Sequence, residues 1–225
     1  MTLRIIDVEQ RSDEWYAERR GIVTASVVGQ LITTKTLAVA ANDTSRALTA
    51  TLVAERITGW TDDTYQSADM LRGVWDEPIA RQVYSEKYAP VTECGFMVRD
   101  DWGFSIGYSP DGLVGEDGLI EVKSRRPKAH LATILADTVP AEHVAQTQCG
   151  LLVSGRDWCD YVSFCGGMPL WTKRVWADPL WAKAIVAAVT AFEDAAVVMT
   201  ADYHTAVAGL PATERTNYEF SGIEF

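Results

Sequence analysis

Apolar residues recur with helical spacing over the first part of the chain. Ser12 and Thr24 can cap two short helices. Two longer amphipathic helices are predicted at about 44–57 and 70–88, where apolar residues return every three or four positions. Pro78 lies within the second of these and is expected to kink or restart it. Residues 1–90 are therefore expected to be mostly helical.

From Val91 onward the pattern changes to alternation with a period of two, and glycines separate the segments. Helices are predicted to begin near Pro127, Pro140 and Pro179. The predicted strands are 92–98, 104–109, 112–114, 119–124, 160–165 and 170–176. These elements indicate an α/β protein in which one central mixed sheet has helices before, within and after it.

The composition is that of a globular protein with a hydrophobic core, since 48% of the 225 residues are hydrophobic and 23% are charged. We expect a single domain over 1–225, with a mostly helical part (1–90), a sheet with inserted helices (91–176) and a C-terminal helix and tail (177–225). The longest nearly apolar run, 184–192, is shorter than the ~20 residues of a membrane span. The N-terminus also lacks the apolar core of a secretory signal, so a cytoplasmic protein without a membrane partner is expected.

The cysteines and the charge balance narrow the possible functions. The four cysteines contain no C-x-x-C pair, which favours reduced thiols over disulfides or an iron–sulfur cluster. With 20 Lys and Arg against 31 Asp and Glu, the formal net charge of −11 argues against a general nucleic-acid coat. Several cations nevertheless gather in 123–128, which is compatible with a local DNA-binding cleft in an acidic protein.

Two short polar motifs, S-P-D-G and L-I-E-V-K, carry the strongest chemical signal. Asp111 follows one predicted strand, and Glu121 and Lys123 alternate with apolar residues on the next, so both polar side chains face one side. Two carboxylates placed in this way suit Mg²⁺, and the backbone carbonyl of Val122 is a further candidate ligand. Lys123 can hold or deprotonate an attacking water, or stabilise charge in a transition state.

The surrounding blocks distinguish this pattern from a hairpin that carries solvated charges. In order along 15–148 they are W-Y-A-E-R-R-G-I-V-T-A-S, R-G-V-W-D-E-P-I-A-R, S-P-D-G, E-V-K and H-V-A-Q-T-Q. In these blocks the chain resembles the lambda-type exonuclease family, the YqaJ-like viral recombinases, of the PD-(D/E)xK nuclease superfamily. The resemblance implies a restriction-endonuclease-like α/β core, in which a central mixed sheet is flanked by helices and the N-terminal region is helical.

The resemblance also implies roles at the metal centre. Asp111 and Glu121 match metal ligands, and Lys123 matches the residue that handles the nucleophilic water. Glu77 matches a helical acidic residue that assists metal binding, often at a second ion or through water. Gln146 matches the glutamine that supports the lysine and the water. One or two Mg²⁺ ions, or Mn²⁺ in their place, are the implied cofactor.

The remaining matched residues concern DNA. Arg19, Ser26 and Ser109 match a pocket that grips the 5′-terminal phosphate of the degraded strand, and a guanidinium beside hydroxyl groups suits an anion. Three cations that follow the catalytic strand are expected to contact the DNA backbone: Arg125, Arg126 and Lys128.

Together these features predict an exonuclease that digests the 5′-ended strand of linear double-stranded DNA and leaves a 3′ overhang for a single-strand annealing partner. The family implies a homotrimer and a phage or prophage gene in a bacterial host. Two alternatives stay open, an endonuclease of restriction or junction-resolving type and a noncatalytic DNA-binding scaffold. A closed circular duplex separates the first alternative from the exonuclease, and Mg²⁺ binding separates the second.

Overall fold

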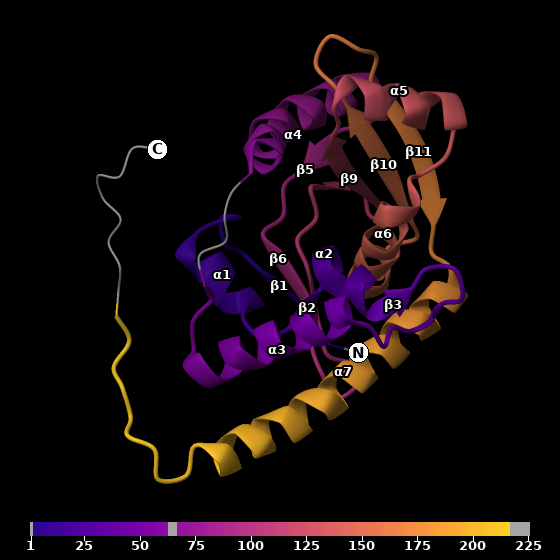
Figure 1. Ribbon diagram of the computed structural model, residues 1–225. Helices are drawn as coiled ribbons and strands as arrows, with labels where there is room; N and C mark the ends of the chain where they lie inside the picture. Colours follow the sequence, from indigo (N-terminus) through magenta and orange to yellow (C-terminus); the bar gives the residue numbers. More distant parts are fainter. Residues whose placement is uncertain (1, 63–66, 217–225) are drawn as a thin grey trace.

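The computed structural model describes residues 2–62 and 67–216 and has an α/β architecture (Figure 1). Its helices are α1 (Asp13–Arg19), α2 (Ala25–Val28), α3 (Asp43–Thr58), α4 (Ala68–Lys87), α5 (Pro127–Ala136), α6 (Ala141–Ser154) and α7 (Pro179–Ala206), with a 3-10 turn at Gly29–Leu31. Its strands are β1 (Leu3–Ile6), β2 (Val23–Thr24), β3 (Ile32–Thr33), β4 (Ala38–Val39), β5 (Val91–Thr92), β6 (Phe96–Arg99), β7 (Ile106–Tyr108), β8 (Gly112–Val114), β9 (Gly118–Ser124), β10 (Trp158–Phe164) and β11 (Trp171–Trp176).

The strands form two mixed sheets instead of the single central sheet that the sequence pattern predicts. One sheet has the order β1-β6-β7-β2 and the other the order β11-β10-β9-β8-β5, while β3 and β4 form a separate hairpin. The predicted strand 92–98 is divided between the sheets, because β5 pairs with β8 and β6 pairs with β1 and β7. Gly95 lies at the division, where a Cβ atom would lie 2.5 Å from the carbonyl oxygens of Ile6 and Val8. Period-two alternation is the same in both sheets and does not reveal this division.

The N-terminal region is mostly helical as expected, but it also contributes short strands. Strand β1 and the β3–β4 hairpin were not predicted, because strands of two to four residues are too short to show a period-two alternation. Helix α2 has four residues, and the side chain of Thr24 makes no cap hydrogen bond. Helix α4 continues through Pro78 without the expected restart. Ala80 and Tyr84 on the same helix are buried against the sheet, and this packing offsets the backbone hydrogen bond that proline lacks.

Helices cover both faces of the sheet that contains β9 and β10. Helix α4 packs on one face, where Ala80 and Tyr84 meet Ile120 and Val122 of β9 in a small apolar cluster. Helix α6 packs against β10 and also against β6 and β7, so it links the two sheets. The larger apolar cluster lies around α6 and α7. Strand β9 is therefore central, with β10 parallel to it on one side and β8 antiparallel to it on the other.

Helix α7 begins at Pro179, as predicted, and extends beyond the rest of the fold at its C-terminal end (Figure 1). By length and composition alone it could span a membrane, and it is the one such helix among the described residues. Its inner face belongs to the larger apolar cluster through Trp181, Ile185, Val189 and Phe192. Packing in the core accounts for the apolar inner face of α7, whereas Val197 and Val198 on the same helix are exposed.

Substitution of Gly118 is expected to destabilise the central sheet. Gly118 pairs with Trp158 across β9 and β10, and a Cβ atom would lie 2.2 Å from the indole ring. Gly118→Ala should lower the free energy of unfolding by about 1–3 kcal/mol, measured by urea denaturation. Gly73→Ala in α4 is the matched control, since a Cβ there meets nothing within 4 Å. The control should be neutral or gain about 0.5–1 kcal/mol, and equal stability of the two variants would contradict the packing argument.

Candidate active site

Strand β9 presents its polar side chains toward α6 and its apolar side chains toward α4. Glu121 is completely buried and Lys123 is largely buried, whereas Ile120 and Val122 belong to the cluster under α4. Asp111 lies directly before β8, the strand paired with β9. The alternation inferred from sequence therefore places both polar side chains of E-V-K on one face, as expected.

The carboxylate of Glu121 is the centre of a hydrogen-bond network. Its Oε1 atom accepts hydrogen bonds from Lys123 Nζ, at 2.7 Å, and from the side-chain amide of Gln146 on α6. Its Oε2 atom accepts from the hydroxyl of Tyr108, at 3.3 Å. A buried carboxylate requires such donors, so the network fixes the position of Glu121. Gln146 thus lies beside Glu121 and the lysine, although α6 is far along the chain from β9.

Asp111 faces the same network from the end of the neighbouring loop. Its Oδ2 atom accepts a hydrogen bond from the backbone N–H of Val122, at 2.6 Å. Burial raises the pKa of Asp111 well above its usual range, and the charges of Glu121 and Glu77 raise it further. The positive charge of Lys123 and the Val122 N–H act in the opposite direction. A site that crowds carboxylates in this way is stabilised by a cation.

The same carboxylates control the protonation of Lys123. Burial by itself would lower the pKa of Lys123, but the charges of Glu121 and Asp111 outweigh burial and raise the pKa above its usual value. The ammonium form is therefore favoured. As an ammonium group in the metal-free protein, Lys123 can donate hydrogen bonds and stabilise negative charge.

The donor set fits a hard divalent cation. Across residues 2–62 and 67–216, no three His, Cys, Asp or Glu side chains are grouped so that they could hold an ion by themselves. Mg²⁺ needs only one or two protein carboxylates, because it keeps several waters and takes phosphate oxygens of the substrate. Asp111 and Glu121 supply two such carboxylates, and the raised pKa of Asp111 is the electrostatic cost that a divalent ion would relieve.

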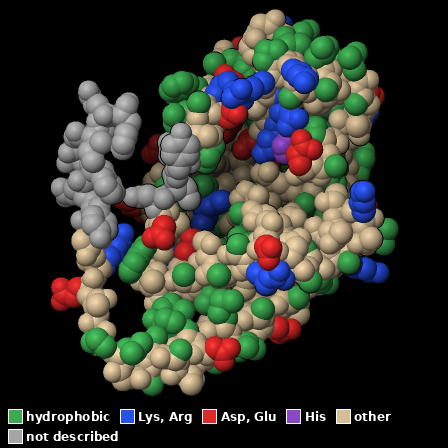
Figure 2. Space-filling view, viewed as in Figure 1, with side chains coloured by type: hydrophobic (Ala, Val, Ile, Leu, Met, Phe, Trp, Pro, Cys, Tyr) green, Lys and Arg blue, Asp and Glu red, His purple; other side chains and the backbone are tan. Residues whose placement is uncertain are grey.

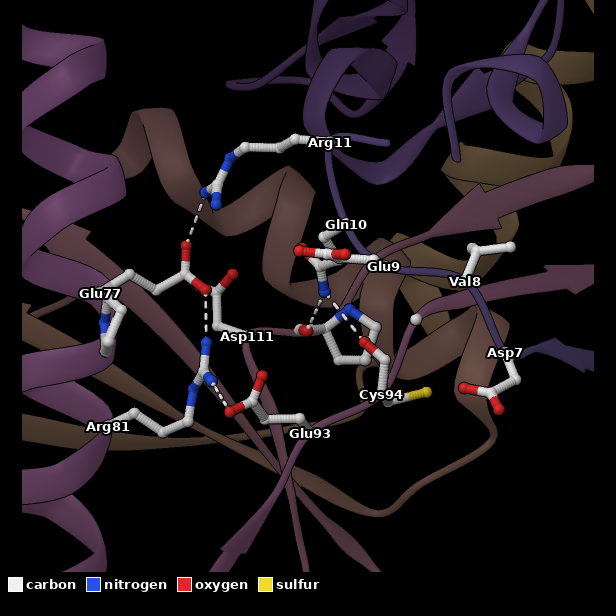
Figure 3. Close-up of a pocket in the computed structure, with 13 residues that line it drawn as sticks. Asp7, Val8, Glu9, Gln10, Arg11, Glu77, Arg81, Glu93, Cys94 and Asp111 are labelled. Atoms are coloured by element: carbon white, nitrogen blue, oxygen red, sulfur yellow. Dashed lines mark hydrogen bonds and ion pairs between the residues drawn. The ribbon is translucent and has the colours of Figure 1, made fainter. Parts of the chain in front are cut away.

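Glu77 and Asp111 line the same cavity of about 470 Å³, and their carboxylates lie next to each other (Figure 3). Its Oε2 atom accepts a hydrogen bond from Arg11 at 2.9 Å, and its Oε1 atom accepts one from Arg81 at 2.6 Å. Arg81 also contacts Glu93 at 2.6 Å. Glu77 is thus near the predicted metal centre, but guanidinium groups already occupy both of its oxygens.

Arg19, Ser26 and Ser109 lie together as one polar pocket. The guanidinium of Arg19 donates to the hydroxyl of Ser109 at 3.1 Å and to the hydroxyl of Ser26 at 3.3 Å. Trp15 supports both partners, because its indole N–H donates to Ser109 at 2.8 Å and its ring lies 3.9 Å from the Arg19 guanidinium carbon. Burial lowers the pKa of Arg19 to about 10, which leaves the side chain charged at neutral pH. A cationic fork with two hydroxyl groups can hold a phosphate.

The predicted DNA-binding cations follow the end of β9, and each has different surroundings. Arg125 contacts Glu142 on α6 at 3.3 Å, and Arg126 contacts Asp69 on α4 at 2.9 Å. Lys128 is exposed on α5. Figure 2 shows a hollow between the part that carries α4 and α5 and the part that carries α1 to α3, with Lys and Arg side chains at its rim.

Several residues at these sites were not singled out from the sequence. Tyr108 directly precedes S-P-D-G and contacts Glu121, so its place in that block was an available signal. No sequence signal pointed to Arg11, because the residue that it contacts, Glu77, lies 66 residues away. The Nδ1 atom of His143 forms a hydrogen bond with the hydroxyl of Tyr161 at 2.8 Å. Burial and, to a smaller extent, the nearby charge of Lys123 lower the pKa of His143 to about 4. It is therefore neutral at pH 7.

The fold is of the restriction-endonuclease-like α/β class. Residues 14–157 match the model of the YqaJ-like viral recombinase domain, and the chain belongs to this family. A comparison with curated proteins finds no match.

Solved structures agree with this assignment. An alkaline exonuclease (LHK-Exo) from Laribacter hongkongensis is 32% identical, with a TM-score of 0.79, and the match covers 89% of this chain and 100% of that one. The same enzyme in complex with dAMP matches with a TM-score of 0.78, at the same identity and coverage. A phage-related exonuclease from Haemophilus somnus 129PT is 15% identical over 79% of this chain and 96% of its own, with a TM-score of 0.58, and supports the fold alone.

Proposed function

We propose that this protein is a Mg²⁺-dependent exonuclease, active also with Mn²⁺, that degrades the 5′-ended strand of linear double-stranded DNA. The observation that carries the proposal is the convergence of Asp111, Glu121 and Lys123 on one side of β9. Membership in the YqaJ-like family, and 32% identity with an alkaline exonuclease, support hydrolysis of DNA as the reaction.

The residues of the site have different roles in the proposed reaction. Asp111, Glu121 and the Val122 carbonyl would hold the cation, which would polarise the scissile phosphate and make water a competent nucleophile at neutral pH. Lys123 donates hydrogen bonds as an ammonium group and stabilises the negative charge that develops on the phosphoryl oxygens. Gln146 and Tyr108 hold Glu121, so that the carboxylate keeps its place when the substrate enters.

The polar pocket around Arg19 gives the enzyme its preference for a 5′-phosphorylated DNA end. A 5′-phosphate carries more negative charge than a phosphodiester within the strand, so a partly buried guanidinium with two hydroxyl groups favours it. This pocket has no evident role in an internal cutter, so it favours an exonuclease over an endonuclease. The noncatalytic scaffold is disfavoured by the intact charged residues Asp111, Glu121 and Lys123.

Other features of the proposed function rest on the family. We propose that residues 1–225 act as one nuclease domain in a homotrimer, and that a single-strand annealing protein receives the 3′ overhang. Arg125, Arg126 and Lys128 are proposed to contact the DNA backbone, with Glu142 and Asp69 released from the two arginines when phosphates replace them. A phage or prophage gene is the proposed source.

The test of this function compares three substrates in the presence of Mg²⁺. Linear duplex with 5′-phosphate ends should release mononucleotides faster than linear duplex with 5′-hydroxyl ends, and closed circular duplex should stay intact. Linearised circles would support the endonuclease. Binding of DNA with no hydrolysis of any substrate would support the scaffold.

Arg19→Lys should remove the preference for phosphorylated ends. Lysine keeps the charge but loses the fork that contacts Ser26 and Ser109. The rate on 5′-phosphate ends should fall by about tenfold to a hundredfold, toward the rate on 5′-hydroxyl ends, which should change little. Arg46→Ala is the matched control, since that arginine is exposed and pairs only locally with Asp43. An equal loss on both kinds of end would contradict the pocket's role.

A further inference from the structure

The turn that follows α1 is held by two neighbouring residues of α3. Gly21 donates its backbone N–H to Oε2 of Glu55 at 2.7 Å, and its carbonyl oxygen accepts from Nε of Arg56 at 2.6 Å. Gly21 has a φ of +67°, and a Cβ atom there would lie 2.5 Å from Cγ of Arg56. The turn therefore needs glycine, and α3 fixes the end of the helix that carries Arg19.

The two residues of α3 differ in how their charges are compensated. Arg56 forms a bidentate ion pair with Glu193 on α7, which packs beside α3, and both N···O distances are 2.7 Å (Figure 1). Glu55 is only 9% exposed, and it forms no ion pair in the part of the chain that the structure describes. A buried carboxylate without a direct cationic partner needs compensation from a charge nearby.

Arg19 supplies this compensation from two residues before Gly21. Burial lowers the pKa of Arg19, whereas Tyr16 and then Glu55 act in the opposite direction. A phenol is ordinarily uncharged at neutral pH and a carboxylate is charged, so Glu55 is the group of the two that carries negative charge there. Among the described residues no carboxylate pairs directly with the guanidinium, which donates to the two serine hydroxyls of the pocket.

A phosphate in the polar pocket around Arg19 would share the charge of this guanidinium with Glu55. Two anions beside one cation repel each other, and the repulsion is strong where water is largely excluded. Glu55 therefore weakens the binding of a 5′-phosphate without touching it. An exonuclease that releases mononucleotides must free its end pocket after every hydrolysis, so a moderate affinity suits repeated cycles.

We propose that Glu55 is a positioning residue that limits the affinity of the pocket around Arg19 for the 5′-phosphate, so that the pocket empties after each hydrolysis. Its hydrogen bond holds the Gly21 turn, and its charge lowers the phosphate affinity. This inference rests on the proposed 5′-phosphate pocket and deepens it by naming the residue that sets the strength of binding.

The test measures binding of a short duplex that has either a 5′-phosphate or a 5′-hydroxyl end, by fluorescence anisotropy in EDTA, which prevents hydrolysis. Glu55→Gln removes the charge and keeps an oxygen for the Gly21 N–H. It should raise the ratio of the affinities for the two ends by about threefold to tenfold, with binding of the 5′-hydroxyl duplex unchanged.

Two further variants separate the charge from the hydrogen bond. Glu55→Asp keeps the charge on a shorter side chain, so its affinity ratio should stay close to that of the wild type. Glu193→Gln weakens the ion pair that holds Arg56 on the other side of the turn, and it should not raise the ratio. Thermal melts should show that all three variants are folded at the temperature of the assay.

The outcomes distinguish this inference from the proposed function. A purely structural role of Glu55 predicts the opposite sign, because a loosened turn would weaken phosphate binding. An affinity ratio that is unchanged or lower in Glu55→Gln, or that rises equally in Glu55→Asp, would overturn the inference and leave the pocket in place. A wild type that binds both ends equally would overturn the pocket itself, and this inference with it.

Discussion

Lys123→Ala is expected to reduce the rate of DNA degradation by about 10²–10⁴-fold under saturating Mg²⁺. The substitution removes the ammonium group that the carboxylates hold at the site. It leaves Glu121 with its hydrogen bonds from Gln146 and Tyr108, so the fold and the ion should be retained. The measurement is the initial rate of nucleotide release from 5′-phosphorylated linear duplex.

A control for this substitution lies five residues further along the chain. Lys128 is exposed on α5 and touches none of the carboxylates of the site. Lys128→Ala should weaken DNA binding slightly and reduce its salt dependence, with little effect on the rate at saturating DNA. If Lys123→Ala keeps a rate within a few fold of the wild type, the proposed role of the lysine is wrong.

Asp111→Asn is expected to raise the melting temperature of the protein in EDTA and to abolish its response to Mg²⁺. Burial and the charges of Glu121 and Glu77 raise the pKa of Asp111, so the ionised form is unfavourable in the folded state without a cation. Asparagine removes the charge and keeps an oxygen that can accept the Val122 N–H. Mg²⁺ at about 100 times its Kd should stabilise the wild type by about 2.7 kcal/mol, which corresponds to about 5–10 °C.

The stability difference between the wild type and Asp111→Asn is also expected to depend on pH. A carboxyl group whose pKa is raised in the folded state binds its proton more tightly when folded than when unfolded. The contribution of Asp111 to the stability of the metal-free wild type should therefore rise as the pH falls from neutral toward the usual range of aspartate, so the advantage of Asp111→Asn over the wild type should shrink over that interval. Thermal melts in EDTA at several pH values measure this. An equal Mg²⁺-induced rise in both proteins would show that the ion binds elsewhere.

The sequence was sufficient to predict the local structure around the site. Alternation in L-I-E-V-K placed Glu121 and Lys123 on one face of a strand, because successive side chains of any strand point to opposite sides. The helix predicted to begin near Pro140 is α6, which begins at Ala141, and Gln146 lies on it. These features depend on a few neighbouring residues and on a repeating period.

The arrangement of the strands depended on contacts between distant residues, which the period-two alternation of the sequence does not reveal. The division of 92–98 into β5 and β6 follows from which partners each half finds, and those partners lie in different parts of the chain. Pro78 is tolerated in α4 because the residues after it are buried against the sheet. Both differences arise from tertiary packing that overrides a local preference.

What the sequence by itself determined is the set of chemical groups and the strand that carries two of them, since composition and period are local properties of the chain. Only the tertiary structure decided which groups meet. It brought Tyr108 and Gln146 to Glu121, Trp15 to Ser109, and Arg11 to Glu77. The physical reason is that burial makes charges and hydrogen bonds act strongly over a few ångströms, and such distances between remote residues are set by the packing of sheets and helices.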